Sequence, residues 1–537
     1  MPLWFVVGLF AVLIALQLGA VALFLWLGTR WWNVPNVSFR RAMATTITLL
    51  LWGAVILAAE PWIGEKSSSI APAIALLVLG LGGQLCIIKW ILRARIGKAV
   101  LMWLVVAAVS CAFGLAPAFA IRASLLETFV VPTGSMAPTI LGSHSNVLCN
   151  DCGFSYAVGR RPMEQFNIAS AICPNCGSTD PSTLQTTVLS GDRIFVEKRA
   201  ALRRWGLIVF RPPDQPQTLF VSRLIGLPRE TAALSGGHIY VDGRIVRRDL
   251  STAVDLWQTS HDTRFFAHQV APKTPHWQPA ADSKWRQNGP AWSCDASDGD
   301  GGELQLQGDI VDRLAYNSPY PSVRQQFFTG DIKLDCSIDS FDGDGKLLVR
   351  WDFDKQSAVA TIGADGKVSL DVVAANGRDH AAQPLKADAT LAARPSRGQL
   401  ITFAVRDGRA YVCQDGKTAV SIDVGSETLA DQSEEPPDSG CRLAIGVQRC
   451  KLAMSRLLLS QQIGFRTIKE MGADAERHVS AKAFGSAMKL GADEYLVLGD
   501  NTEFSRDSRF YGPIKRKAII GVARWIYWPV ERWHEFQ

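Results

Sequence analysis

The stretch FVVPTGSMAPTI, residues 129–140, stands where the chain changes from long apolar runs to short runs rich in branched and aromatic residues. Its Gly-Ser-Met triplet places a small hydroxyl side chain, Ser135, in a segment that also holds two prolines. Glycine and proline are typical of loops. A serine in such a loop either stabilises the turn through its hydroxyl or is the nucleophile of a hydrolase. Features elsewhere in the chain decide between these alternatives.

Four apolar segments with few or no charges precede this loop, at residues 3–27, 42–59, 70–92 and 99–121. Each is close to the roughly 20 residues with which a helix crosses about 30 Å of hydrocarbon. A cleaved signal peptide fits badly, because no basic residue precedes the first segment and it exceeds a typical signal-peptide apolar region in length. We therefore predict four transmembrane helices within residues 1–122. The alternative is that one segment, most naturally the short second one, is a buried or re-entrant helix.

The charges of the connecting loops predict the orientation of these helices. Three arginines follow the first segment and three basic residues follow the third, whereas the loop after the second holds two glutamates and one lysine. Positively charged loops stay on the cytoplasmic side. We therefore expect a multi-pass protein of the cytoplasmic membrane, with every residue after 122 on the extracytoplasmic side.

Length and charge limit the remaining function classes. At 537 residues, with 48% hydrophobic and 20% charged residues, the chain is long enough for two or three domains. Its net charge of +6 is modest, and no dense stripe of lysine and arginine alternates with aromatic residues. Such a stripe is the usual footprint of a nucleic-acid-binding surface. We therefore expect the lipid bilayer as a partner and no nucleic acid.

Short runs typical of strands follow the loop at residues 188–198, 206–213, 218–228 and 237–246, and return at 493–529. Glycine and proline separate these runs, and the pair Asp242-Gly243 predicts a tight hairpin. The sequence therefore predicts a β-rich domain that a long middle region interrupts.

Four segments resemble, in order and in residue type, the four characteristic boxes of type I signal peptidases: VVPTGSMAPTI, GDRIFVEK, SRLIGLPRE and LGDNTEFSRDSRFYG. The resemblance covers about residues 123–250 and 490–530. It implies a membrane-anchored serine endopeptidase that cuts signal peptides from exported preproteins. We expect a mainly β extracytoplasmic region, a signal-peptidase β-fold with an inserted antiparallel β-sandwich, anchored by N-terminal transmembrane helices. The expected divisions are membrane helices (1–122), catalytic region (123–253), inserted domain (254–465) and the rest of the catalytic region (466–537).

The same resemblance assigns roles to individual residues. Ser135 matches the nucleophile, and Thr133 matches the hydroxyl that forms an oxyanion hole with the Ser135 backbone N–H. Such preorganised donors can each contribute on the order of 10²–10³ in rate. The last box supplies the supporting residues, which are Ser505 to orient the base, Asp507 and Arg509 as an ion pair, and Asp500 in a Gly-Asp-Asn turn.

The general base is where the chain departs from this pattern. Type I signal peptidases have a lysine immediately before the arginine of the third box, but Ser222 stands there, before Arg223. A serine cannot replace a neutral lysine as proton acceptor, and a guanidinium stays protonated. Lys198 and His144 are alternative bases, although surface or loop structure is the plainer interpretation of both. Two functions remain open: a working signal peptidase with an unusual base, or an impaired paralogue that acts as a membrane-anchored binding protein.

Four cysteines follow the nucleophile loop as two Cys-x2-Cys pairs, CNDC and CPNC, separated by 20 residues. Paired thiolates on two tight turns can enclose a tetrahedral zinc ion. We expect a structural zinc ribbon at residues 144–180, inserted in the catalytic region. The alternative is two disulfides, which the extracytoplasmic side permits. The proposed ligands are Cys149, Cys152, Cys173 and Cys176.

The middle region carries alternating strand-like runs separated by Asp-Gly turns at 365–366, 407–408 and 415–416. This pattern favours an antiparallel sandwich. The order QLITFAVRDGRAYV followed by DGKT resembles concanavalin A-like and laminin-G-like jelly rolls, which implies a glycan or protein ligand; a spacer domain is the alternative. Four tryptophans are candidates for stacking on sugar rings or for packing, namely Trp257, Trp277, Trp285 and Trp292.

Overall fold

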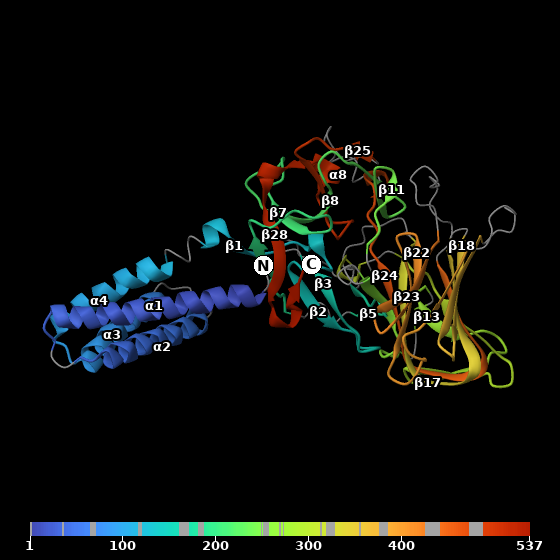
Figure 1. Ribbon diagram of the computed structural model, residues 1–537, viewed down its shortest axis with the longest axis horizontal. Helices are drawn as coiled ribbons and strands as arrows, with labels where there is room; N and C mark the ends of the chain where they lie inside the picture. Colours follow the sequence, from blue (N-terminus) through green and yellow to red (C-terminus); the bar gives the residue numbers. More distant parts are fainter. Residues whose placement is uncertain are drawn as a thin grey trace. The chain divides into compact units, whose positions relative to one another are not determined.

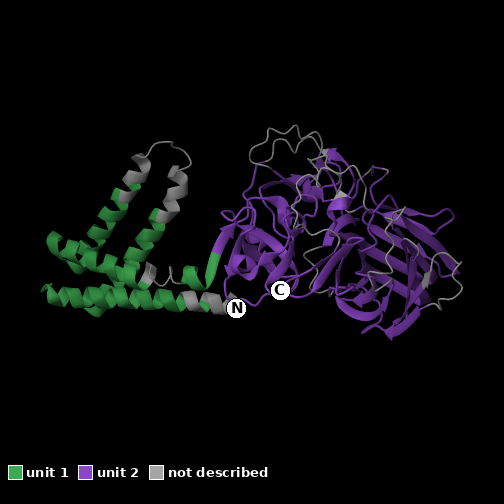
Figure 2. Ribbon diagram, turned by 90° about the horizontal axis from the view of Figure 1, so that it is seen from above, with its two compact units in different colours: residues 1–127 green, residues 128–537 purple. Residues whose placement is uncertain are grey.

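The computed structural model has a mainly β fold with four N-terminal helices (Figure 1). It forms two compact units, Met1–Glu127 and Thr128–Gln537 (Figure 2). The structure describes residues 3–34, 37–64, 71–115, 121–160, 171–180, 187–248, 250, 257–267, 270–271, 273–311, 314–317, 328–353, 356–374, 385–424, 441–471 and 487–536.

The first unit is helical. Its elements are α1 (Leu3–Trp31), α2 (Phe39–Gly64), α3 (Ala71–Leu92) and α4 (Ile96–Ser110), which continues into the π-helical turn η1 (Cys111–Leu115). Small and branched residues pack between the helices and form their common core, including Val21, Leu25, Ala42, Ile88 and Leu92. Many large apolar side chains face outward instead, as in Leu16, Leu51 and Leu104.

Three segments of these helices are long and apolar enough to cross a membrane: Ala11–Trp31, Phe39–Ile56 and Ile96–Phe113. They correspond to the first, second and fourth of the predicted spans. Within α3, the apolar stretch among the described residues is the shorter Val78–Leu92. The third predicted span, whose first residues lie outside the described side chains, stays a prediction. Residues 116–120 of the fourth predicted span lie outside the described residues.

The second unit contains an eight-stranded sheet built from both ends of its sequence. Strands from before and after the middle region alternate in it, because β28 pairs with both β6 and β7, and β26 pairs with β8. In spatial order the strands are β1 (Leu126–Val130), β6 (Arg193–Glu197), β28 (Ile519–Trp528), β7 (Leu207–Phe210), β8 (Phe220–Gly226), β26 (Glu494–Leu498) and β27 (Ile514–Lys515), with β29 (His534–Glu535) beside β28.

Smaller sheets flank this one. A four-stranded sheet has the order β11 (Arg244–Ile245), β10 (His238–Val241), β9 (Thr231–Ser235) and β25 (Ala487–Lys489). Its β10–β11 hairpin turns at Asp242-Gly243, as predicted, with both residues at positive φ. Two further hairpins carry the cysteine pairs, β2 (His144–Leu148) with β3 (Ser155–Gly159), and β4 (Ala171–Ile172) with β5 (Thr179–Asp180).

The middle region forms a separate antiparallel network of thirteen strands. We call it the inserted β region and define it as residues 257–462. Its two longest strands, β17 (Ile332–Phe353) and β24 (Arg442–Gln462), pair along most of their length. The other strands are β12 (Trp257–Asp262), β13 (His276–Pro279), β14 (Trp285–Asn288), β15 (Ala291–Asp295), β16 (Asp300–Gln307), β18 (Gln356–Gly363), β19 (Lys367–Ala374), β20 (Leu385–Thr390), β21 (Leu400–Arg406), β22 (Arg409–Gln414) and β23 (Lys417–Asp423). The predicted Asp-Gly turns join β18 to β19, β21 to β22 and β22 to β23.

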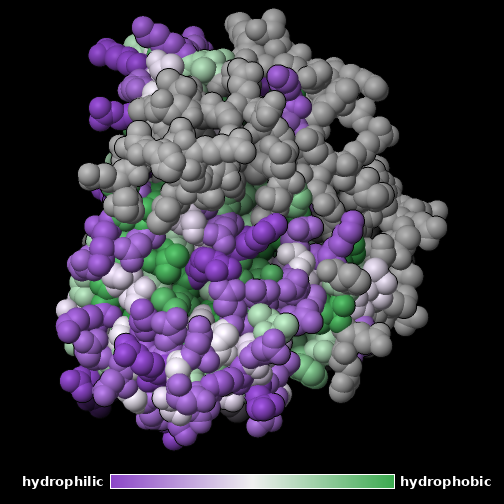
Figure 3. All heavy atoms as spheres, turned by 90° about the vertical axis from the view of Figure 1, so that its right-hand side faces the viewer, coloured by the Kyte–Doolittle hydropathy of each residue, from purple (hydrophilic) through white to green (hydrophobic). Residues whose placement is uncertain are grey.

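Apolar side chains from both long strands form one core in the inserted β region. Trp277, Trp285 and Trp292 belong to it and are nearly inaccessible, so these three tryptophans serve packing rather than an exposed sugar platform. Trp257 is half-buried, with Arg406 and Lys333 over its ring. On the face shown in Figure 3, hydrophilic side chains predominate among the described residues.

Candidate active site and four-cysteine centre

The predicted nucleophile lies in a short 3-10 turn, η2 (Gly134–Met136), between strands β1 and β2. Ser135 is half-buried, and its Oγ lies 3.5 Å from Oγ1 of Thr133. The loop folds back on itself so closely that a Cβ added at Gly142 would overlap the Thr133 backbone. The two hydroxyls assigned to nucleophile and oxyanion hole are therefore neighbours on one tight loop.

A turn from the far end of the sequence holds this loop in place. The backbone N–H of Asn501 donates to the carbonyl oxygen of Ser135 at 3.0 Å, and its side-chain Nδ2 donates to the carbonyl oxygen of Gly134 at 2.9 Å. The hydroxyl of Thr139 donates to Oδ2 of Asp500 at 2.6 Å. Sequence reasoning identified Asp500 but missed Asn501, although it is the third residue of the Gly-Asp-Asn turn.

The third box meets the same turn. Ser222 lies in β8, opposite Ile208 of β7, and is 2% exposed. The next residue, Arg223, donates from Nε and Nη2 to the two carboxylate oxygens of Asp500, at 2.7 and 2.6 Å. The structure therefore brings the first, third and fourth boxes together around Asp500.

No lysine or histidine among the described residues lies within hydrogen-bonding distance of the Ser135 hydroxyl, whose described partner is Thr133. The imidazole of His144 is buried, with Nδ1 2.8 Å from the carbonyl oxygen of Gly142. Lys198 directly follows β6, and no hydrogen bond joins it to Ser135 among the described residues. Neither alternative base is therefore hydrogen-bonded to Ser135 in this part of the chain.

The last box supplies a fully buried ion pair. Arg509 donates from Nε and Nη2 to the carboxylate of Asp507, at 2.8 and 2.7 Å, and both side chains are inaccessible. Asp507 also caps the short helix α8 (Ser508–Tyr511) and accepts the backbone N–H of Gly499. Ser505 packs against Gly499 so tightly that a Cβ there would overlap the Ser505 hydroxyl and crowd the Ser135 carbonyl oxygen. The Ser505 hydroxyl and the Ser135 carbonyl oxygen thus both lie close to this glycine.

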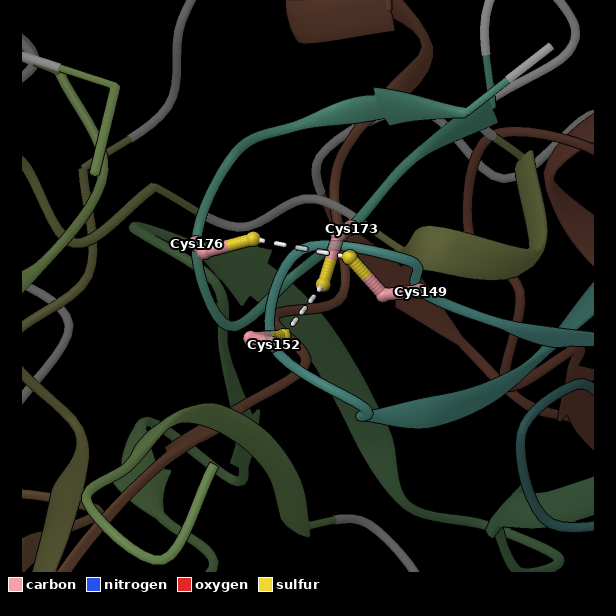
Figure 4. A group of neighbouring side chains, drawn as sticks. All are labelled: Cys149, Cys152, Cys173 and Cys176. Atoms are coloured by element: carbon pink, nitrogen blue, oxygen red, sulfur yellow. Dashed lines mark hydrogen bonds between the residues drawn. The ribbon is translucent and has the colours of Figure 1, made fainter. Parts of the chain in front are cut away.

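The four cysteines of the two hairpins converge on one point (Figure 4). Sγ of Cys149 lies 3.6 Å from that of Cys176, and Sγ of Cys152 lies 3.7 Å from that of Cys173. All four sulfurs lie within 4.8 Å of one another and are buried. Four sulfurs around a zinc ion at about 2.3 Å are about 3.8 Å apart in a regular tetrahedron. The cluster therefore has the spacing that a zinc site needs.

Both turns of this centre have the same backbone geometry. Gly153 and Gly177 lie at positive φ, and their N–H groups donate to the carbonyl oxygens of Cys149 and Cys173. All four cysteines are free thiols in this structure. Hydrogen bonds from the neighbouring thiols lower the pKa of Cys152 to about 2, whereas the bond to Cys152 raises the pKa of Cys173. The two pKa values move in opposite directions because the two thiols share a hydrogen bond.

The second cysteine turn also binds the inserted β region. Asn175, which is fully buried between Cys173 and Cys176, donates to the carbonyl oxygen of Phe265 at 2.8 Å and accepts the N–H of Asp262 at 2.6 Å. Its carbonyl oxygen lies 3.0 Å from Nδ1 of His261. Burial lowers the pKa of His261, and this effect outweighs the hydrogen bond to Asn175, which raises it.

A second buried polar cluster joins the four-stranded sheet to the inserted β region. Asp407 accepts two hydrogen bonds from the guanidinium of Arg248, and Nδ1 of His238 lies 3.5 Å from Asp407 and 3.8 Å from Asp331. These three acidic and imidazole groups are close enough to share a cation. Arg248 and Arg406 already supply positive charge there. The cluster is therefore an internal ion network.

A half-buried serine beside a second hydroxyl, in a loop held by buried ion pairs, is compatible with the class of serine hydrolases. Comparison with known protein families shows a more specific similarity. The sequence model for "Signal peptidase, peptidase S26" matches residues 178–274 and 423–528, which include Ser222 and Asp500 but not Ser135.

Individual relatives give the same result. The chain is 31% identical over 144 residues to a signal peptidase I of Rickettsia akari and 30% identical over 146 residues to one of Rickettsia prowazekii. These matches cover 27% of this chain and 45% and 46% of those relatives, so the chain spans a little under half of their length. Over the matched residues the chain is therefore similar to signal peptidase I.

Solved structures resemble the chain only weakly. A laminarinase catalytic domain from Thermotoga maritima is 9% identical, covers 38% of this chain and 98% of its own, and has a TM-score of 0.27. A carbohydrate-binding module, CBM66 from Bacillus subtilis, is 11% identical, covers 35% of this chain and 92% of its own, and has a TM-score of 0.22. Scores this low carry no conclusion about fold or ligand.

Proposed function

We propose that this chain is a membrane-anchored protein of the signal-peptidase type, which engages the signal peptides of exported preproteins and presents Ser135 for attack on their scissile carbonyl. One observation carries the proposal. Asp500 joins the nucleophile loop, through Thr139, to strand β8, through Arg223, so that three separate boxes meet at one buried carboxylate.

In this reaction the Ser135 oxygen would form an ester bond with the carbonyl carbon, and the peptide nitrogen would leave with a proton. The Thr133 hydroxyl and the Ser135 N–H would donate to the carbonyl oxygen as negative charge develops on it. Ser505 and the ion pair of Asp507 with Arg509 would hold Gly499 in place beside the Ser135 loop. A water molecule would then hydrolyse the ester.

A second candidate function is favoured by Ser222. This residue occupies the position of the usual lysine, and a serine hydroxyl does not accept a proton at neutral pH. The chain would then bind signal peptides, or other partners in the cell envelope, without cutting them. Losing one member of a cooperative catalytic unit can lower the rate by on the order of 10⁶.

The apolar helices would anchor the chain in the cytoplasmic membrane, with residues after 122 on the extracytoplasmic side, where signal peptides emerge. Cys149, Cys152, Cys173 and Cys176 would hold a structural zinc ion, which would cross-link the two hairpins. A glycan or protein ligand of the inserted β region would have to contact side chains other than the three core tryptophans.

Cleavage of a preprotein in proteoliposomes tests the proposal. Wild-type protein is compared with Ser135→Ala and with Ser293→Ala, a control at an exposed serine of strand β15. Cleavage that is lost only in Ser135→Ala establishes the peptidase. Specific cross-linking of a signal peptide without cleavage favours the second candidate. The absence of both cleavage and cross-linking would reject both candidates.

A further inference from the structure

A short turn of the inserted β region lies directly against the nucleophile loop. This turn, η5 (Ala315–Asn317), places Tyr316 and Asn317 in buried positions, with 7% and 5% of their surfaces exposed. Leu314 and Tyr316 pack with Ala137 and Leu141 of the loop in one small apolar cluster. The region that interrupts the catalytic sheet therefore returns to the residues around Ser135.

Asn317 forms a reciprocal amide pair with Asn501. Nδ2 of Asn317 donates to Oδ1 of Asn501 at 2.8 Å, and Nδ2 of Asn501 donates to Oδ1 of Asn317 at 2.8 Å. The second amide proton of Asn501 reaches the carbonyl oxygen of Gly134, and its backbone N–H reaches that of Ser135. Asn317 therefore fixes the orientation of the side chain that holds the nucleophile turn.

Asn317 also donates to Oε2 of Glu503 at 3.1 Å. Both amide protons of Asn317 are therefore used in hydrogen bonds, one to Asn501 and one to Glu503. Only one orientation of the two amides lets every N–H group of the pair donate a hydrogen bond. A buried amide that loses its partner keeps the full cost of its lost hydration. Loss of Asn317 thus leaves Asn501 free to turn away from the nucleophile loop.

Tyr316 fills the space beside the nucleophile. Its ring lies where a Cβ on either Gly134 or Gly159 would overlap it, so both glycines are needed for this close approach. Its hydroxyl donates to the carbonyl oxygen of Ser143 at 3.0 Å. The ring and the hydroxyl together restrain both ends of the loop that carries Ser135.

We propose that Asn317 and Tyr316 are positioning residues through which the inserted β region sets the conformation of the Ser135 loop. The inserted β region is then part of the active site's support rather than a separable accessory. The catalytic consequence rests on the proposed function, whereas the structural consequence does not.

Hydrogen exchange of the full-length protein tests the structural consequence. In Asn317→Ala, exchange of peptides covering residues 133–141 and 499–504 should become about ten to a hundred times faster, because the amide pair no longer holds the loop. Asn288→Ala, at an exposed asparagine of strand β14, is the matched control and should leave these peptides unchanged. Equal exchange in the two variants would overturn the proposal.

A compensating pair tests the contact of Tyr316 with Gly134. Gly134→Ala alone should speed exchange of the loop, because its methyl group meets the Tyr316 ring. Combining it with Tyr316→Ala removes that overlap, so the double variant should exchange no faster than Tyr316→Ala alone. Strictly additive effects of the two substitutions would show that the ring does not restrain the loop.

The catalytic consequence is measured on whichever background cleaves a preprotein, wild type or Ser222→Lys. We expect Asn317→Asp, which keeps the size but loses a donor and faces Glu503, to lower kcat about tenfold or more while KM stays within about twofold. A fall in the active fraction with unchanged kcat per active site would indicate packing alone and reject the positioning role. If neither background cleaves, the proposed peptidase activity fails, and the exchange experiments still decide the positioning.

Discussion

Arg223 and Asp500, 277 residues apart in sequence, form a buried two-point ion pair, with 7% and 0% of their side chains exposed. The same carboxylate accepts the hydroxyl of Thr139 from the nucleophile loop. Because Arg223 directly follows Ser222 on β8, the ion pair also fixes where the side chain at position 222 is placed. A substitution at position 222 therefore changes a side chain at a position where the backbone is held in place.

Asp500→Asn should destabilise the second unit strongly. The neutral amide leaves the guanidinium of Arg223 buried without its counter-charge, a change that typically costs about 3–5 kcal/mol. For a unit of this size we expect Tm to fall by about 5–10 °C. Asp388→Asn, which breaks an exposed pair with Lys386, is the control and should leave Tm unchanged. Equal Tm values for the two variants would contradict this account of the pair.

Ser222→Lys should create or increase peptidase activity. A lysine there would be buried, and burial lowers the pKa of an amine, which would let it accept the Ser135 proton. We expect about 10²–10⁴-fold faster cleavage of a preprotein than in wild type, rising with pH as the amine loses its proton. Ser222→Met, similar in length but without an amine, is the matched control. Equal rates for the lysine and methionine variants would show that position 222 does not carry the base.

Features set by a few neighbouring residues could be predicted from the sequence. The Asp-Gly hairpins form where expected because positive φ at the turn glycine, and in three of the four hairpins at the aspartate as well, is a local property. The ion pair of Asp507 with Arg509 spans only two positions. The two cysteine turns likewise depend on a local glycine, at Gly153 and Gly177. The geometry of such motifs depends on residues that are close together in the sequence.

Contacts between distant segments could not be predicted in the same way. Asn317 and Asn501 lie 184 residues apart, and neither belongs to a periodic pattern that would indicate its partner. Asn175 is an ordinary residue of a cysteine turn in sequence, yet it binds three groups of the inserted β region. Such partners depend on how two regions dock, which hydrophobic periodicity does not encode.

The four-cysteine centre should hold about one zinc ion per chain, measured by elemental analysis of the purified protein. Removing it with a chelator should lower Tm and expose four thiols to a thiol reagent, because the hairpins lose their cross-link. Cys173→Ser should lose the metal, whereas Cys86→Ser, at an exposed cysteine of α3, should retain it. Thiols that react only after a disulfide reductant, with no metal present, would support the disulfide alternative.

Stability should also depend on pH through His238. Burial lowers the pKa of this imidazole, but the carboxylates of Asp331 and Asp407 outweigh burial and raise it above its ordinary value near 6.5, against the opposing charge of Arg248. Because the folded pKa is the higher one, the stabilisation is complete below about pH 6.5 and is lost as the pH rises through the folded pKa. Tm of the wild type should therefore fall as the pH rises above about 6.5.

His238→Gln should remove most of this fall, because a glutamine keeps hydrogen-bonding capacity but carries no titrating charge. Burial also raises the pKa of Asp331, so its contribution is likewise lost as the pH rises, and this part of the pH dependence persists in the variant. His276→Gln is the matched control, since Nδ1 of His276 contacts only the backbone carbonyl oxygen of Thr274 among its described hydrogen-bond partners. Differential scanning calorimetry across this pH range measures the difference. Parallel profiles for wild type and His238→Gln would show that the imidazole stays neutral in the folded chain.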